Sequence, residues 1–195
     1  QPSLSFQLPE GVNASARWDP DLHGFWISVP HGELFYAQAF VPQNISDRTL
    51  AYFLENKQGL PVSTDWANLP HDTLAAVDFS NIAWRQDFIQ LYGKRIPLPR
   101  LTSWYGDAGK SYTYSGIQSQ PHAWNKGLSY LKARVEAVAG ASFNSVLLNW
   151  YRSGEDHLSW HADDEKELGH DPMIASLNFG ETRDFVLRLN DDHSI

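Results

Sequence analysis

Apolar residues recur at helical spacing in one long stretch of the chain, residues 121–139. The steps of 4, 3, 4 and 3 residues place side chains on one face of a helix, and the stripe comprises Trp124, Leu128, Leu131, Val135 and Val138. Pro121 suits the first turn of a helix, and Gly140 suits its C-terminal cap. We predict a helix over 121–139 whose apolar stripe packs against a sheet.

Shorter patterns predict a hairpin and a second helix nearer the N-terminus. The strand-like residues 25–29 and 34–36 are joined by a Pro-His-Gly turn at 30–32. A further helix is expected over 46–56, where leucine and phenylalanine repeat at helical spacing and Ser46 can cap the first turn.

The second half of the chain is dominated by strand-like runs. These cover 143–151, 173–179 and 185–189, and polar loops separate them. Helices followed by consecutive strands favour an α+β fold, with helices on one face of an antiparallel sheet. Residues 58–79 are rich in turn formers and give no prediction.

Length and composition indicate a single globular domain without a membrane segment. The 195 residues are 42% hydrophobic, enough for one core or for one core and a small appendage. No apolar run is long enough to span a bilayer. The chain has no cysteine, which excludes disulfides and thiolate metal sites and is compatible with an intracellular protein. Any metal ligand must therefore be His, Asp or Glu.

The charge distribution gives mixed evidence for nucleic-acid binding. The net charge is −8, whereas proteins that contact phosphates usually present a basic surface. Residues 85–110 nevertheless carry five basic and two acidic residues, and residues 155–171 carry one Lys and seven acidic residues. A bound divalent cation would offset part of that acidic cluster.

One motif has the residue types of a metal site. His161 and Asp163 are two residues apart, so in extended backbone both side chains point to the same side. One imidazole and one carboxylate are two of the three ligands in the facial triad that holds non-haem Fe(II). Taken alone, the pair is a weak signal and favours a solvated polar turn over a metal site. Upstream, Asn149 and Tyr151 share one strand face by the same spacing, and buried polar groups there require partners, either a ligand or backbone groups within the core.

Several sequence blocks occur in the order found in one enzyme family. The chain resembles the AlkB-type Fe(II)/2-oxoglutarate dioxygenases, which repair alkylated bases, and it is most similar to the branch that acts on duplex DNA. The resemblance covers residues 89–189. Its blocks are Pro99-Arg100, Trp104-Tyr105-Gly106-Asp107, Tyr112-Thr113-Tyr114-Ser115-Gly116, the segment 149–165 and Ser176-Leu177-Asn178-Phe179-Gly180.

The resemblance implies a fold, a cofactor and a co-substrate. The implied fold is a double-stranded β-helix, a jelly-roll-like core with flanking helices, in one domain over 1–195 with an N-terminal extension of about 80 residues. His161 and Asp163 correspond to metal ligands and catalytic residues for Fe(II). Asn149 and Tyr151 correspond to residues that hydrogen-bond 2-oxoglutarate.

Six further residues correspond to positions that contact the nucleic acid. Tyr112 and Tyr114 would line the pocket for a flipped base, although aromatic residues on strands are more often core residues. Tyr92 would lie at a hairpin tip that wedges into the duplex, or be a buried strand residue. Arg100 is a further substrate-binding candidate, which we expect beside the phosphate path with Lys94 and Arg95. The last two candidates are Asp164 and Glu165, which could also be solvated loop charges.

The family pattern has a second metal-binding His and two arginines after Asp163. His170 lies in the acidic loop and His193 comes too early, so we assign this role to neither. Arg183 and Arg188 also precede the family's positions. We expect that the last strands of the domain are missing from these 195 residues, or that a segment beyond Ile195 supplies them, and that this chain alone is inactive.

These residues support one main hypothesis and two alternatives. The first is oxidative dealkylation of N-alkylated bases in DNA, with Fe(II), 2-oxoglutarate and O₂ giving succinate, CO₂ and formaldehyde. The second is an inactive nucleic-acid or protein-binding module on the same fold. The third is a dioxygenase that acts on RNA or on protein side chains. The partner expected from the first is alkylated nucleic acid, in duplex DNA, and no membrane is involved.

Overall fold

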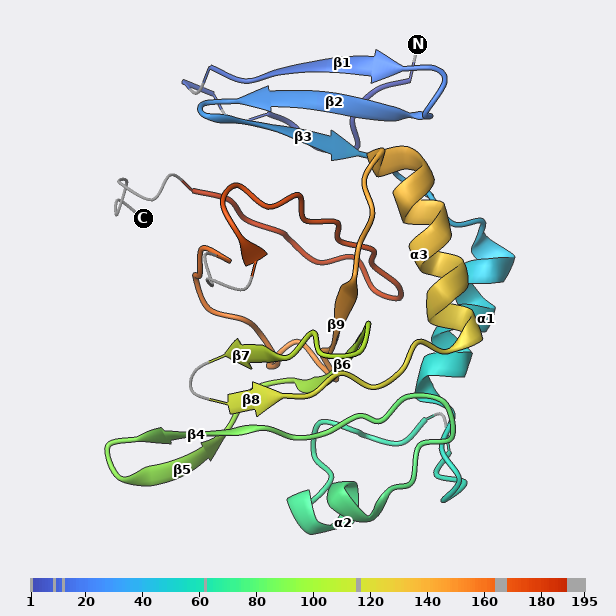
Figure 1. The fold of residues 1–195 in the computed structure, drawn as a ribbon, viewed down its shortest axis with the longest axis vertical. Coiled ribbons are helices and arrows are strands. Elements are labelled where there is room, and N and C mark those ends of the chain that lie inside the picture. The colour runs from blue at the N-terminus through green and yellow to red at the C-terminus, as the bar shows by residue number, and fades with distance from the viewer. Residues whose placement is uncertain are drawn as a thin grey trace. The chain divides into compact units, whose positions relative to one another are not determined.

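The computed structural model describes residues 2–8, 10–11, 13–61, 63–114, 117–163 and 168–188, with the backbone alone for 112–114 and 117–119. The chain forms two compact units, residues 1–46 and 47–195. Over the described residues, the fold is a mixture of helices and antiparallel strand pairs (Figure 1). This agrees with the predicted α+β class. No helix in that part of the chain is long and apolar enough to cross a membrane.

The first unit is a three-stranded antiparallel sheet. β1 (Ser15–Asp19), β2 (Gly24–Val29) and β3 (Gly32–Tyr36) pair in sequence order, with Trp18 opposite Phe25 and Phe25 opposite Tyr36. The hairpin expected over 25–36 is confirmed. Its turn depends on His31, which adopts a positive φ of 64°.

The second unit contains the remaining elements. They are α1 (Gln43–Leu54), which begins before the unit's first residue, α2 (His71–Ala76), β4 (Phe88–Leu91), β5 (Lys94–Pro97), β6 (Leu101–Gly106), β7 (Tyr112–Tyr114), β8 (Ile117–Ser119), α3 (Lys126–Ala139) and β9 (Ser145–Trp150). Its strands form the antiparallel pairs β4–β5, β6–β9 and β7–β8. In Figure 1, β4 and β5 extend from the unit as a two-stranded arm.

Both long helices begin elsewhere than the sequence predicted. α1 starts three residues before Ser46, because the carbonyl of Pro42 already accepts from the amides of Ile45 and Ser46. Ser46 is therefore inside the helix and not its cap. α3 starts after Pro121 because Asn125 caps it, accepting from the amide of Leu128 at 2.9 Å.

The predicted apolar stripe of α3 packs as expected. Leu128 is buried in a core cluster with Tyr105 of β6 and Leu148 of β9, and Phe53 of α1 packs against the same cluster. Figure 1 accordingly shows α1 and α3 side by side. Gly140 ends α3 in the left-handed conformation, with φ of 64°, as predicted.

The β6–β9 pair has one face in the core and one face away from it. On β9, Leu148 is buried in the first cluster, and Trp150 packs against a second cluster around Trp66 and Leu101. Because strand side chains alternate, Asn149 lies on the opposite face. That face carries Asn149, one of the candidate site residues.

Of the three strands predicted in the second half of the chain, two are absent from the described residues, so those two predictions are wrong. The run 143–151 forms β9, but 173–179 and the described part of 185–189 form no strand. Their apolar side chains are largely exposed, with Met173 at 59% and Phe185 at 78%. An alternating pattern becomes a strand only when another backbone pairs with it, and no described segment pairs with these runs.

Candidate metal and co-substrate site

Asn149 presents a buried polar group on the non-core face of β9. It pairs across the sheet with Thr102 of β6, whose hydroxyl donates to Asp87 Oδ2 at 2.9 Å. Asn149 Oδ1 is buried and has no hydrogen-bond partner among the described residues. An unsatisfied buried amide is costly, so this position is suited to a ligand that completes its hydrogen bonds. Tyr151 follows directly after β9, with the Arg183 guanidinium 5.3 Å from its ring centre.

His161 and Asp163 lie side by side, with Nε2 of the imidazole 3.2 Å from Oδ1 of the carboxylate. Nδ1 of His161 is 2.8 Å from the carbonyl oxygen of Ser159, and a carbonyl only accepts, so Nδ1 is the protonated nitrogen. In the neutral ring, Nε2 then directs its lone pair at a carboxylate oxygen. Two electron-rich atoms at this distance require a cation between them, either a proton or a metal ion.

The backbone brings this pair together differently from the sequence prediction. The residues 161–163 are not in a strand, and Asp163 has a positive φ of 48°. Non-glycine residues adopt this conformation at an energetic cost, and such strain is common at functional sites. The pair is half-exposed, with side-chain exposures of 36% and 40%. Over the part of the chain that the structure describes, no third His, Asp or Glu completes a metal-binding group with them.

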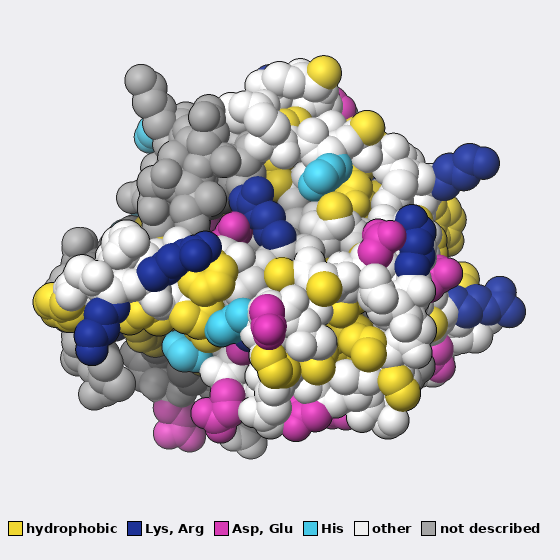
Figure 2. Space-filling model, turned by 90° about the horizontal axis from the view of Figure 1, so that it is seen from below, with side chains coloured by type: hydrophobic (Ala, Val, Ile, Leu, Met, Phe, Trp, Pro, Cys, Tyr) yellow, Lys and Arg dark blue, Asp and Glu magenta, His cyan; other side chains and the backbone are white. Residues whose placement is uncertain are grey.

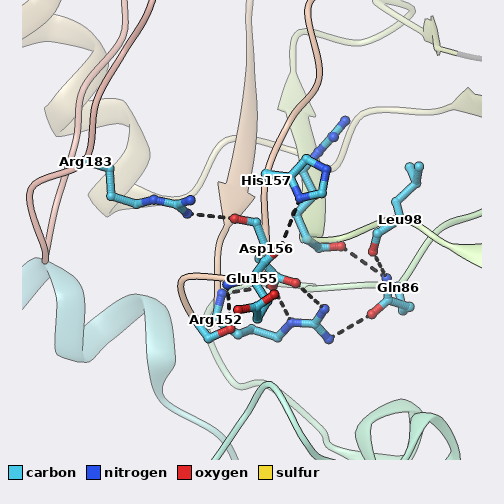
Figure 3. Close-up of polar contacts among 9 residues, drawn as sticks. Gln86, Leu98, Arg152, Glu155, Asp156, His157 and Arg183 are labelled. Carbon is cyan, nitrogen blue, oxygen red and sulfur yellow. Dashed lines mark hydrogen bonds and ion pairs between the residues drawn. The ribbon is translucent and has the colours of Figure 1, made fainter.

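A buried polar network that the sequence pattern does not predict lies between the two motifs. Arg152 and Asp156 form a two-point ion pair, with Nε–Oδ2 at 2.6 Å and Nη2–Oδ1 at 2.9 Å (Figure 3). The third guanidinium nitrogen donates to Gln86 Oε1 at 3.0 Å, and Arg183 donates to the carbonyl of Asp156 at 2.8 Å. The four-residue spacing of Arg152 and Asp156 was the one available sequence signal.

The protonation state of Asp156 follows from this network. Burial by itself would raise the pKa of its carboxyl group. The hydrogen bonds from the Arg152 side chain and backbone, together with the charges of Arg152 and Arg183, outweigh burial and hold that pKa below its usual range. Asp156 is therefore a carboxylate at neutral pH.

Tyr92 lies at the tip of the β4–β5 hairpin, as one of the two sequence interpretations predicted. Its side chain is 95% exposed, and Tyr92 and Gly93 have φ of 49° and 75°. Positive φ at both turn residues is the geometry of a two-residue hairpin. The arm at the left of Figure 2 carries basic side chains beside apolar ones. On this hairpin, Lys94 and Arg95 are exposed, and the Arg95 guanidinium lies 3.9 Å from the Phe88 ring centre.

The other predicted site residues are buried, exposed away from the pair, or not described by the structure. Arg100 is only 3% exposed, so the expectation that it lies on the surface with Lys94 and Arg95 is wrong. Tyr112 and Tyr114 are on β7, without described side chains. Asp164, Glu165 and His193 lie outside the described residues, and His170 is exposed beside Asp171, with Nδ1–Oδ2 at 2.9 Å.

Comparison of the sequence with known proteins identifies the family of this chain. The family model of the 2OG-Fe(II) oxygenase superfamily matches residues 65–194. Human DNA oxidative demethylase ALKBH2 is 45% identical over 103 residues, which are 53% of this chain and 40% of that protein. Human alpha-ketoglutarate-dependent dioxygenase alkB homolog 3 is 50% identical over 91 residues, 46% of this chain and 31% of that protein.

A plant relative matches nearly the whole chain. DNA oxidative demethylase ALKBH2 of Arabidopsis thaliana is 37% identical over 194 residues, which are 97% of this chain and 52% of that protein. The chain thus spans between about a third and about half of the length of these relatives. The chain belongs to the 2OG-Fe(II) oxygenase superfamily and to its AlkB-type dioxygenases.

Proposed function

We propose that the protein removes N-alkyl groups from DNA bases by oxidation, using Fe(II), 2-oxoglutarate and O₂. The observation that carries this proposal is the 3.2 Å approach of His161 Nε2 to Asp163 Oδ1 in a chain of this superfamily. Relatives named DNA oxidative demethylases support the choice of substrate. The products would be succinate, CO₂, formaldehyde and the unmodified base.

His161 and Asp163 fit a divalent metal ion and would hold Fe(II). An imidazole nitrogen and a carboxylate oxygen are ligands of non-haem iron, and a cation relieves the repulsion between Nε2 and Oδ1. When bound with 2-oxoglutarate and O₂, the iron supplies the oxidation of the N-alkyl carbon. The hydrogen bond from Nδ1 to the Ser159 carbonyl fixes the ring orientation and keeps Nε2 as the ligand atom.

Asn149 and Tyr151 fit the co-substrate. The buried Asn149 amide lacks a partner for its oxygen, and rotating the amide by half a turn presents its NH₂ group instead. That NH₂ group would donate to a carboxylate of 2-oxoglutarate. The phenol of Tyr151, one residue beyond the end of β9, would provide a second hydrogen bond.

Residues of the β4–β5 hairpin and of β7 would contact the DNA substrate. Tyr92 would enter the base stack, and Lys94 and Arg95 would contact phosphates. Tyr112, Tyr114, Asp164 and Glu165 would contact the flipped base. Duplex DNA is the proposed partner because a wedge is useful only where bases are stacked.

The finer fold we propose is the double-stranded β-helix. Its support is the family match over residues 65–194 and the β6–β9 pair that bears Asn149. A structure of the full-length protein in which β6 and β9 belong to one of two facing sheets would support this core, and one in which they remain an isolated pair would reject it.

The experiment that tests the function is a repair assay on full-length protein. Duplex oligonucleotides that carry one N-methylated base are incubated with Fe(II), 2-oxoglutarate and O₂, and restored base and succinate are quantified by mass spectrometry. We expect both products, loss of both without 2-oxoglutarate, and loss of both in His161→Ala. His170→Ala is the matched control, because His170 also faces an aspartate but is fully exposed. DNA binding without turnover would instead favour an inactive binding module.

A further inference from the structure

The ion pair between Arg152 and Asp156 fixes the segment that precedes the metal-ligand motif. Both side chains are only 8% exposed, and the carboxylate also accepts from the backbone amide of Arg152 at 3.0 Å. A buried charge pair is tolerated only when its hydrogen bonds are complete, so this geometry allows little variation. Asp156 is five residues before His161 and seven before Asp163.

Gln86 extends this pair to a distant part of the chain. Its Oε1 accepts from Arg152 Nη1, and its Nε2 donates to the carbonyls of Leu98 and Arg100 at 2.5 and 3.2 Å (Figure 3). The amide can take only this orientation. If it were reversed, its oxygen would face two carbonyls and its NH₂ group would face a guanidinium.

These contacts lie at the root of the β4–β5 hairpin. Gln86 is two residues before β4 begins, and Leu98 directly follows β5. The amide of His157 also donates to the Pro99 carbonyl at 3.0 Å. The two ends of the hairpin are therefore joined to the segment 152–157 by side-chain and backbone hydrogen bonds.

We propose that Gln86, Arg152 and Asp156 form a positioning network that sets where Tyr92 stands relative to His161 and Asp163. The strands of this hairpin have four residues each, so its tip extends roughly 13 Å from its root. A small rotation at the root therefore displaces Tyr92 by several times the displacement at Gln86. The network makes Gln86 a determinant of duplex over single-stranded substrate, and this inference rests on the proposed function.

The physical reason for substrate selectivity is that only a duplex needs the wedge. The unstacked base must enter the site at a fixed distance from the point where Tyr92 enters the stack. A single strand reaches the site without being opened. Loosening the hairpin root thus affects duplex repair and leaves single-strand repair intact.

Two variants of Gln86 test this proposal in the full-length protein. Gln86→Met removes both sets of hydrogen bonds at nearly the same volume. Gln86→Glu keeps an acceptor for Arg152 but loses the donor to the Leu98 and Arg100 carbonyls. The matched control is Gln58→Met, because Gln58 also donates its amide to a backbone carbonyl, that of Ala76, away from the network.

Two measurements are made well below the unfolding midpoint of each variant. The first is the ratio of repair rates on duplex and single-stranded substrate of one sequence. The second is the fluorescence of 2-aminopurine placed beside the lesion in the duplex, which rises when the base stack opens and needs no turnover. We expect both Gln86 variants to lower the ratio by about ten-fold or more and to reduce the fluorescence rise. Gln58→Met should change neither.

The outcomes separate this proposal from the proposed function. If the Gln86 variants lose repair rate equally on both substrates, the cause is general destabilisation and the positioning role is overturned. An unchanged ratio of repair rates together with an unchanged fluorescence rise overturns it as well. The wild-type protein could open the duplex more than the Gln86 variants do and yet restore no base. That outcome would reject the proposed function and leave the positioning role in place.

Discussion

Two acid–base pairs in one short segment of the chain have opposite physical character. Arg152 and Asp156 are buried, and every side-chain contact joins a donor to an acceptor. His161 and Asp163 are half-exposed, and their facing atoms are both electron-rich when the imidazole is neutral. The first pair is complete within the protein and the second is completed only by a cation. This difference separates a residue pair that stabilises the fold from a pair suited to binding a ligand.

The largest expected effect is the loss of 2-oxoglutarate turnover when the half-exposed pair is broken. Replacing Asp163 with Ala removes a proposed metal ligand, so 2-oxoglutarate turnover should fall at least about 100-fold. The thermal unfolding midpoint should change far less than the activity, because Asp163 is half-exposed. A small decrease is expected because alanine tolerates a positive φ less well than aspartate does. Succinate release and calorimetry measure the two quantities. Asp171→Ala is the control, and unchanged succinate release in Asp163→Ala would remove this residue from the mechanism.

The buried pair should show the reverse pattern in stability. Asp156→Asn leaves the buried Arg152 guanidinium without its counter-charge, so the free energy of unfolding should fall by about 3 kcal/mol. The matched control is Glu136→Gln in α3, where Lys132 and Glu136 have the same four-residue spacing but are more exposed. Its expected cost is less than about 1 kcal/mol. Urea denaturation measures both, and similar losses would show that burial does not distinguish the two pairs.

The comparison extends to the exposed hairpin tip, where a smaller effect is expected. Tyr92 has almost no contacts to lose, so Tyr92→Ala should leave stability unchanged. Repair of duplex substrate should fall by about ten-fold, because a lost base-stacking contact is worth 1–3 kcal/mol, roughly, per base. Repair of single strands should remain near the wild-type rate. Equal losses on both substrates would shift the preferred substrate towards single-stranded nucleic acid.

The smallest effect concerns pH. The pKa of Asp156 is lowered in the folded protein, so folding favours its ionised form. Its stabilisation is complete above the unfolded value of about 3.9 and is lost as the pH falls through the lower folded value. The stability difference between wild type and Asp156→Asn, measured by urea denaturation from neutral to acidic pH, should therefore be constant near neutrality and shrink in acid. A constant difference down to the lowest pH would contradict the role of this charge.

The sequence by itself determined the elements whose pattern is local. The α3 stripe, its Gly140 cap and β9 follow from side-chain periodicity and turn chemistry, which act over a few residues. For Tyr92 the sequence left two interpretations, and the structure places it at a hairpin tip. The order of the family's blocks also identified His161 and Asp163 as a pair.

Only the tertiary structure decided the features that join distant residues. The first turn of α3 depends on Asn125 and not on Pro121, and the approach of His161 to Asp163 depends on a left-handed residue and not on a strand. Gln86 meets Arg152 across 66 positions of sequence, and no periodicity encodes such a contact. The runs 173–179 and 185–188 show the same limit, because an alternating pattern states which face a strand would bury but not whether another backbone pairs with it.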